Sequence, residues 1–550
     1  MSEATRQVEK THGPVYWFVR NIFAPLLAPL GRMIAAHRFA VIALVVLFIL
    51  AALFFRETWQ PAAVLMRRYA VPIALASLFL YFVRLVSGRA RWWIQGIIWG
   101  VALALLTVAV AGYQYYSLWV RYNSLNVVYL EKGEMPETDH ERLLPLSAVH
   151  STVKANTGDS KTPTEPVYVR KYAGTQEVFH WSMAVEPNYW WRQIFGNITE
   201  TWSLPGNDPG LRLSEEKKKQ VHFVVGPSLW LASNSHTAAV RTFGPLRFFS
   251  YEAHDVRFLE DDKGEVVQIV SLLRWRGYLA PYPEFGGVLI IRQAPDVSLM
   301  EILGKMVTGA SSKEDFAQAS DVVVRWAKRV LVGEGNWVTP ENIVHFPYLR
   351  GQNVMPFRAS EYIAESFRFM GGVLAPLPGY HEGDVRVPNP EDDSNKQPYA
   401  TYFKSVRDLP GMLYHYFSLE PYLKGRHGQV ASLLLPADGT NRVLVYPNQK
   451  YGENLNGVSN IAGQIRASRR DYKFGTENKP SEHRPYVKTI DGVKRFFWLT
   501  TIVTTDTEGK IVIGKTELTI TDPASTSGED VFWVDPRKPE EWVNQLRKKQ

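Results

Sequence analysis

Acidic side chains and a histidine gather in one proline-rich stretch, residues 375–398. Carboxylate oxygens are the ligands that Ca²⁺ prefers, so this stretch could hold a calcium ion. The regular ligand spacing of a calcium-binding loop is missing, which leaves a solvated loop without an ion as the alternative. The candidate metal ligands are His381, Asp384, Asp392 and Asp393.

The same residue types could serve a hydrolase whose active site is assembled from distant parts of the chain. The sequence has no G-x-S-x-G, H-E-x-x-H or G-x-G-x-x-G motif and no EF-hand loop. Residues for a dispersed site would be His381, Asp384, His415 and His427. We therefore assign no catalytic residue and no cofactor from the sequence.

A basic segment with interleaved aromatic residues follows near the C-terminal third of the chain. It could contact phosphates of lipid headgroups or of nucleic acid, or it could be a basic loop balanced by acidic residues elsewhere. Its residues are Arg466, Arg469, Arg470, Tyr472, Lys473 and Phe474.

The distribution of positive charge along the chain shows whether a nucleic-acid partner is to be expected. The net charge of the chain is +8, but residues 1–121 hold twelve of its 62 Lys/Arg and only three of its 54 Asp/Glu. Residues 122–550 are therefore almost neutral, which argues against a nucleic-acid partner. The chain has no cysteine, which excludes disulfides, thiol catalysis and cysteine-ligated metals.

Three apolar runs precede these residues and predict three membrane-spanning helices: 39–55, 69–83 and 92–120. The run 69–83 is short, so it is the least secure of the three, and a soluble helical hairpin is the alternative. Gly96, Gly100 and Gly112 predict close helix contacts. Residues expected to mark the membrane interfaces are Arg38, Arg56, Arg68, Arg84, Trp92, Trp93 and Trp119.

Basic residues next to the runs predict the orientation. The N-terminal segment and the second loop carry eight, whereas the opposite side carries four. The positive-inside rule then places the N-terminus in the cytoplasm and residues 122–550 outside it, and this placement reverses if 69–83 does not span.

The rest of the chain predicts an α+β region rich in antiparallel strands. A hairpin is expected at 256–275, a buried strand at 287–292, helices at 297–307, 311–331 and 359–370, and a strand meander at 485–521. The predicted division is an interfacial segment 1–38, an anchor 39–121, a polar tether 122–176, a β-rich domain 177–295, a helical segment 296–372, a second β-rich domain 373–536 and an amphipathic helix 537–550.

These features favour a membrane-anchored structural or scaffold subunit of a cell-envelope assembly in a bacterial inner membrane. Its expected partners are the lipid bilayer and other membrane or envelope proteins, or further copies of itself. The alternatives are a membrane-anchored envelope hydrolase and an accessory subunit of a transport complex. The spans contain no acidic residue, which argues against an independent transporter.

Overall fold

The computed structural model describes residues 38–88, 90–173, 176–208, 217–294, 307–308, 313–368, 385–387, 397–421, 428–440, 442–475, 478–505, 516–525 and 527–548. The chain divides into two compact units, residues 1–59 and 60–550. The expected helix 297–307 lies almost entirely outside the described residues.

The first unit contains helix α4 (Arg38–Phe54), which is apolar after its first residue. It has 17 residues, and at 1.5 Å per residue it is about 25 Å long. Its end is marked by a turn at Phe55, and the Trp59 indole N–H donates to the Ala52 carbonyl oxygen at 2.8 Å.

Among the described residues two helices, rather than the expected three, are long and apolar enough to cross a membrane: α5 (Arg56–Ser87) and α6 (Trp92–Asn123). The first apolar run forms a helix that is too short to count as a membrane span, because α4 ends after 17 residues. The run 69–83, which we expected to be the least secure, lies within a 32-residue helix. The helix continues because residues 56–68 are also helical, although they include charged side chains.

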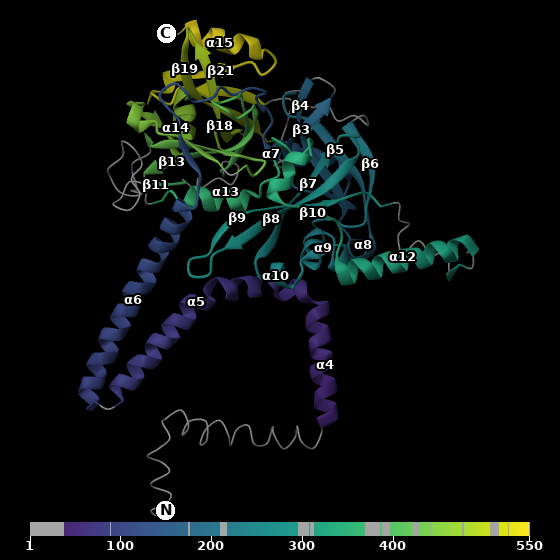
Figure 1. The fold of residues 1–550 in the computed structure, drawn as a ribbon. Helices are drawn as coiled ribbons and strands as arrows, with labels where there is room; N and C mark the ends of the chain where they lie inside the picture. The colour runs from purple at the N-terminus through teal and green to yellow at the C-terminus, as the bar shows by residue number, and fades with distance from the viewer. Residues whose placement is uncertain are drawn as a thin grey trace, which may run out of the picture. The chain divides into compact units, whose positions relative to one another are not determined.

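The first part of α5 packs on the α+β region instead of pointing away from it. Val64 is fully buried in the hydrophobic core, and the Gln60 amide donates to the carbonyl oxygens of Phe248 and Tyr251. Figure 1 shows α5 bending along its length, and Pro61 and Pro72 lie inside it. Proline removes a backbone hydrogen bond and is a common cause of such bends.

The α+β region is built mainly from antiparallel strand pairs, as the sequence predicts (Figure 1). One sheet has the order β2-β4-β5-β6 with β3 on β4, and a second has the order β10-β9-β8-β7. Their strands are β2 (Lys161–Pro163), β3 (Val167–Ala173), β4 (Gln176–Pro187), β5 (Ile198–Pro205), β6 (Lys218–Phe223), β7 (Tyr251–Glu260), β8 (Val266–Arg276), β9 (Tyr282–Ile291) and β10 (Asn336–Val338).

The C-terminal half forms the remaining sheets, of which the largest has the order β1-β16-β15-β13-β11 with β12 on β13. A small pair joins β14 to β17, and the last sheet has the order β18-β19-β20-β21. The strands are β1 (Val127–Tyr129), β11 (Val385–Arg386), β12 (Tyr399–Phe403), β13 (Met412–Pro421), β14 (Gly428–Gln429), β15 (Ala431–Pro436), β16 (Val443–Tyr446), β17 (Leu455–Asn456), β18 (Asn478–Ile490), β19 (Val493–Thr504), β20 (Glu517–Thr521) and β21 (Val531–Val534).

Two sequence-predicted hairpins are confirmed. Strands β7 and β8 pair in antiparallel register across the turn at residues 261–265. Strands β18 and β19 are joined at Asp491 and Gly492, which have φ angles of 49° and 80°. Positive φ at both central residues gives the tight turn that matches the twist of paired strands, and Asp-Gly is a favoured pair for it.

Helices cover the sheets and close the chain: α7 (Leu146–Thr157), α8 (Trp190–Phe195), α9 (Ser235–Thr242), α10 (Pro245–Phe248), α12 (Lys313–Val332), α13 (Phe357–Glu365), α14 (Val458–Ser468) and α15 (Pro539–Lys548), with short 3₁₀ turns η3 (Leu231–Ser233), η4 (Pro340–His345), η6 (Gln449–Tyr451) and η8 (Gly528–Asp530). The expected C-terminal amphipathic helix is confirmed, because α15 buries Trp542 and Leu546 against the last sheet.

The segment expected to be a polar tether, 122–176, is instead part of the folded region. Its strand β1 runs parallel to β16, and α7 buries Ala148, Val149 and Val153. Short apolar groups such as Leu143 and Leu144 fill positions in two cores. The sequence suggested a tether because these groups are separated by polar residues, while partners such as β16 and the last sheet lie hundreds of residues away.

Candidate functional site

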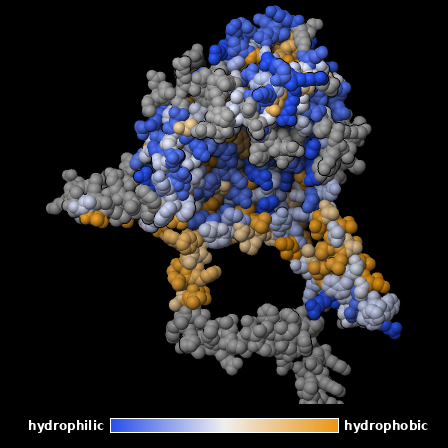
Figure 2. All heavy atoms as spheres, turned by 180° about the vertical axis from the view of Figure 1, so that it is seen from behind, coloured by the Kyte–Doolittle hydropathy of each residue, from blue (hydrophilic) through white to orange (hydrophobic). Residues whose placement is uncertain are grey.

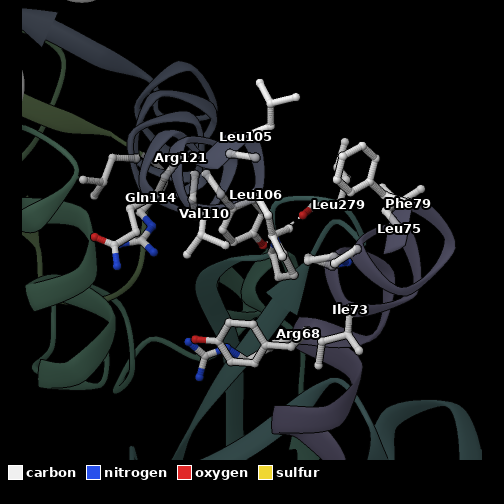
Figure 3. Close-up of a pocket in the computed structure, with 18 residues that line it drawn as sticks. Arg68, Ile73, Leu75, Phe79, Leu105, Leu106, Val110, Gln114, Arg121 and Leu279 are labelled. Atoms are coloured by element: carbon white, nitrogen blue, oxygen red, sulfur yellow. Dashed lines mark hydrogen bonds between the residues drawn. The ribbon is translucent and has the colours of Figure 1, made fainter. Parts of the chain in front are cut away.

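A groove of about 780 Å³ lies between α5 and α6 and is bounded at one end by the loop that joins β8 to β9 (Figure 3). Most of the side chains that line it are apolar. They are Tyr69, Pro72, Ile73, Leu75, Ala76, Phe79, Leu105, Leu106, Ala109, Val110, Tyr113, Leu118, Leu279 and Pro281, with the polar Arg68, Gln114, Ser117 and Arg121. Its volume falls within the range of about 300–1,000 Å³ typical of ligand sites.

The polar groups of the groove are placed toward the α+β region. Arg68 precedes the apolar stretch of α5, and Arg121 follows the apolar stretch of α6. Figure 3 shows Gln114 and Arg121 on the side of the groove away from Phe79. The Tyr113 hydroxyl donates to the Leu279 carbonyl oxygen at 2.9 Å, which ties α6 to the β8–β9 loop.

The β8–β9 loop and α10 carry exposed apolar side chains next to α5. Leu246 is 90 % exposed and Tyr278 is 68 % exposed. Figure 2 shows apolar residues along the rim from which α5 and α6 leave the α+β region, whereas the surface beyond the rim is mainly hydrophilic. We call these exposed side chains the apolar rim: Leu246, Phe249, Tyr278 and Leu279. Its β8–β9 part adjoins α5, because Leu279 lines the groove and the Arg67 guanidinium carbon lies 4.9 Å from the centroid of the Tyr278 ring.

The residues expected to mark membrane interfaces lie at the helix ends. Arg38 begins α4, Arg56 begins α5, and Arg84 lies in the last turn of α5. Trp92 and Trp93 open α6 with exposed side chains, and Trp119 stacks on Tyr116 near its other end, with ring centroids 6.1 Å apart. Arg68 differs from the others because it lines the groove.

The close helix contacts expected from three glycines are not made by the part of the chain that the structure describes. A Cβ atom added at Gly96, Gly100 or Gly112 would meet no other atom within 4 Å. Gly96 and Gly100 are one turn apart on α6 and precede its groove-lining residues, which begin at Leu105.

His415 belongs to a buried hydrogen-bonded chain of side chains. The Ser360 Oγ lies 2.6 Å from His415 Nδ1, and His415 Nε2 lies 2.9 Å from Asn353 Oδ1. A histidine that is oriented by an amide can activate a serine hydroxyl as a nucleophile, but all three residues here are 0 % exposed. Burial lowers the pKa of His415 well below its usual range, and Arg257 lowers it further. The chain of hydrogen bonds therefore connects α13 to β13 inside the core and has no access to a substrate.

The other predicted catalytic and metal residues, His381, Asp384, Asp392, Asp393 and His427, lie outside the described residues. Within the described ranges, no group of three or more His, Asp or Glu side chains is placed to hold a metal ion. In the basic segment, Arg469 lies over the Trp533 ring at 3.9 Å and 3.5 Å from a Glu517 carboxylate oxygen. That arginine is therefore engaged within the fold.

Sequence reasoning counted Arg121 only for orientation and did not connect it with Arg68. The signal that could have connected them is a basic residue at the same end of two successive apolar helices. Comparison of the chain with protein-family models, with curated protein sequences and with solved structures gave no match.

Proposed function

We propose that this protein is a membrane-anchored structural or scaffold subunit of a cell-envelope assembly, held in the bilayer by α5 and α6. Only 11 % and 6 % of the most apolar stretches of these helices are buried within the protein. Apolar side chains with such exposure are stable in lipid but costly in water. The apolar rim extends this surface to the base of the α+β region.

The observation that carries the scaffold proposal is the open glycine face of α6. Glycines four residues apart let two helix backbones approach closely, which is a common way for membrane helices to associate. Gly96 and Gly100 have this spacing, and within the described ranges no side chain occupies the space next to them. A helix of a partner protein or of a second copy would fit there.

Replacing Gly96 and Gly100 with leucine is expected to weaken this association by about tenfold or more, because the larger side chains keep the helices apart. The fold of the chain itself should not change, since no atom lies within 4 Å of either new Cβ. The measurement is the oligomeric state and the set of co-purifying proteins in a mild detergent, as a function of concentration.

Gly112→Leu provides the matched control. It places the same side chain in equally open space on the same helix, but about 160° around the axis from Gly96. The scaffold proposal is wrong if the wild-type protein is monomeric without co-purifying proteins. The assignment of the glycine face is wrong if the Gly96/Gly100 variant associates as the wild type does.

We also propose that residues 122–550 lie outside the cytoplasm at the inner membrane. As a hairpin, α5 and α6 return the chain to the side from which it entered. The last turn of α5 carries Arg84 and the short connection to α6 carries Arg89 and Arg91, and short basic loops tend to face the cytoplasm. The N-terminal segment reaches the cytoplasm only if α4 also crosses.

The absence of cysteine makes this topology directly measurable. Single cysteines are introduced at Ala90, in the helix connection, and at the exposed Lys263, in the β7–β8 turn. We expect a membrane-impermeant maleimide to label Lys263→Cys in intact cells with an opened outer layer, and Ala90→Cys only after permeabilisation. The reverse result would place the α+β region in the cytoplasm. Equal labelling of both without permeabilisation would show that the hairpin does not span.

A further inference from the structure

The polar end of the groove is positively charged. Of the described residues that line it, two carry guanidinium groups, Arg68 and Arg121, and none carries a carboxylate. The two cations are close enough to repel one another. Among the described residues, no carboxylate oxygen lies within 4 Å of either guanidinium group, so an anion of the right shape would relieve this repulsion.

Aromatic rings hold the two arginines in place. The Arg68 guanidinium carbon lies 3.7 Å from the centroid of the Trp275 ring, and that of Arg121 lies 5.1 Å from the centroid of Tyr362. The rings of Trp275 and Tyr362 are in edge-to-face contact, with centroids 5.5 Å apart. A guanidinium that lies over a ring keeps its N–H groups in its own plane, where they can donate to an anion.

The neighbouring charged groups leave hydrogen-bonding capacity on these arginines. Glu252 accepts the Trp275 indole N–H at 3.1 Å and lies 3.5 Å from His254, and Glu365 lies near Arg121 without forming an ion pair with it. Arg121 donates to the Tyr362 carbonyl oxygen at 3.4 Å, while its buried Nε has no hydrogen-bond partner. Buried donors without partners are costly, which favours a ligand that supplies acceptors.

We propose that the groove between α5 and α6 binds one anionic phospholipid, with its phosphate at Arg68 and Arg121 and an acyl chain against the apolar walls. This inference rests on the proposed insertion of α5 and α6 in a membrane. Guanidinium groups are well suited to phosphate because they present several N–H donors in a fixed plane. The change from a cationic end to an apolar channel matches the change from headgroup to acyl chain.

The test is native mass spectrometry of the full chain released from nanodiscs that contain phosphatidylglycerol and phosphatidylcholine. We expect one retained phosphatidylglycerol per chain in the wild type. The double variant Arg68→Gln/Arg121→Gln should retain it about tenfold less, because two charge contacts are lost. Arg91→Gln, which removes an arginine from the helix connection outside the groove, should retain lipid as the wild type does.

A groove-filling variant, Ala109→Phe, tests the apolar part with both arginines intact. It should also lose the lipid, because Ala109 lines the groove. Equal retention of both lipids by the wild type, or unchanged retention in the Arg68/Arg121 variant, would overturn the proposal. Binding of soluble glycerol phosphate as tightly as the lipid would also overturn it in favour of a free-phosphate site. Extraction of the wild-type chain from membranes by alkaline carbonate would instead refute the proposed anchoring.

Discussion

Glu482→Gln is expected to lower the free energy of unfolding by about 3–5 kcal/mol, because it leaves two buried guanidinium groups without a counter-charge. Arg142 Nη2 lies 2.6 Å from the Glu482 Oε2, and Arg484 Nη1 lies 3.4 Å from the same oxygen. All three residues are buried. The pKa of Arg484 is lowered to about 10, chiefly by burial and also by the charge of Arg142, while Glu482 opposes the shift.

The second carboxylate oxygen of Glu482 accepts the Leu146 backbone N–H at 2.6 Å. The substitution therefore also weakens the connection between residues 142–146 and the sheet of β18 and β19. Denaturant unfolding of the detergent-solubilised chain measures the loss, and hydrogen exchange of the β18 and β19 amides locates it. Glu541→Gln removes one partner of an exposed pair with Lys538 and should leave both readouts unchanged. Equal stability of Glu482→Gln and the wild type would show that the buried pair does not stabilise the fold.

Glu420→Gln is expected to remove a pH dependence of stability worth about 3 kcal/mol. Glu420 lies in β13, is 0 % exposed, and accepts the Ser459 hydroxyl at 2.7 Å and the Ser459 backbone N–H at 3.2 Å. Burial raises its pKa from 4.5 to about 7, although the hydrogen bonds from Ser459 and the charge of Arg386 oppose this shift. The neutral acid is therefore the form that the folded protein favours.

The direction of the effect follows from proton binding. Between pH 4.5 and about 7 the folded protein keeps a proton on Glu420 that the unfolded chain has released. The stabilisation from this group is therefore complete below about pH 4.5 and is lost as the pH rises through 7. Unfolding free energies at pH 5 and pH 8 measure it, and the difference between the two pH values should be about 3 kcal/mol smaller in Glu420→Gln. The same pH dependence in both proteins would contradict the assigned pKa.

The membrane helices show where sequence patterns were sufficient and where they were not. Long uncharged runs predicted apolar helices, because the exposure of apolar side chains to water is costly in any fold. The run 69–83 looked short because only its uncharged residues were counted. The helix extends through residues 56–68 because Gln60 and Val64 find partners in the α+β region. Those partners are nearly two hundred residues away along the chain, which local patterns do not reveal.

The candidate site likewise depends on contacts that local sequence patterns do not reveal. Residues 381–393 were selected from the sequence because they include a histidine and several carboxylates. The one described histidine of the proposed dispersed site, His415, is buried in the core. The groove depends instead on Arg68, Arg121 and two rings from the α+β region. Each of these residues is common by itself, so only their proximity in the folded chain distinguishes them.

The sequence by itself determined the elements that local physics controls: the apolar helices, the hairpins with turns such as Asp491-Gly492, and the amphipathic C-terminal helix. Periodicity and turn chemistry act over a few residues, so they are visible in the printed chain. Only the tertiary structure decided which distant residues meet, as in the parallel pairing of β1 with β16 and the ion pair of Arg142 with Glu482. Such contacts are selected by the packing of whole sheets and helices, whose free energy is shared among many residues far apart in sequence.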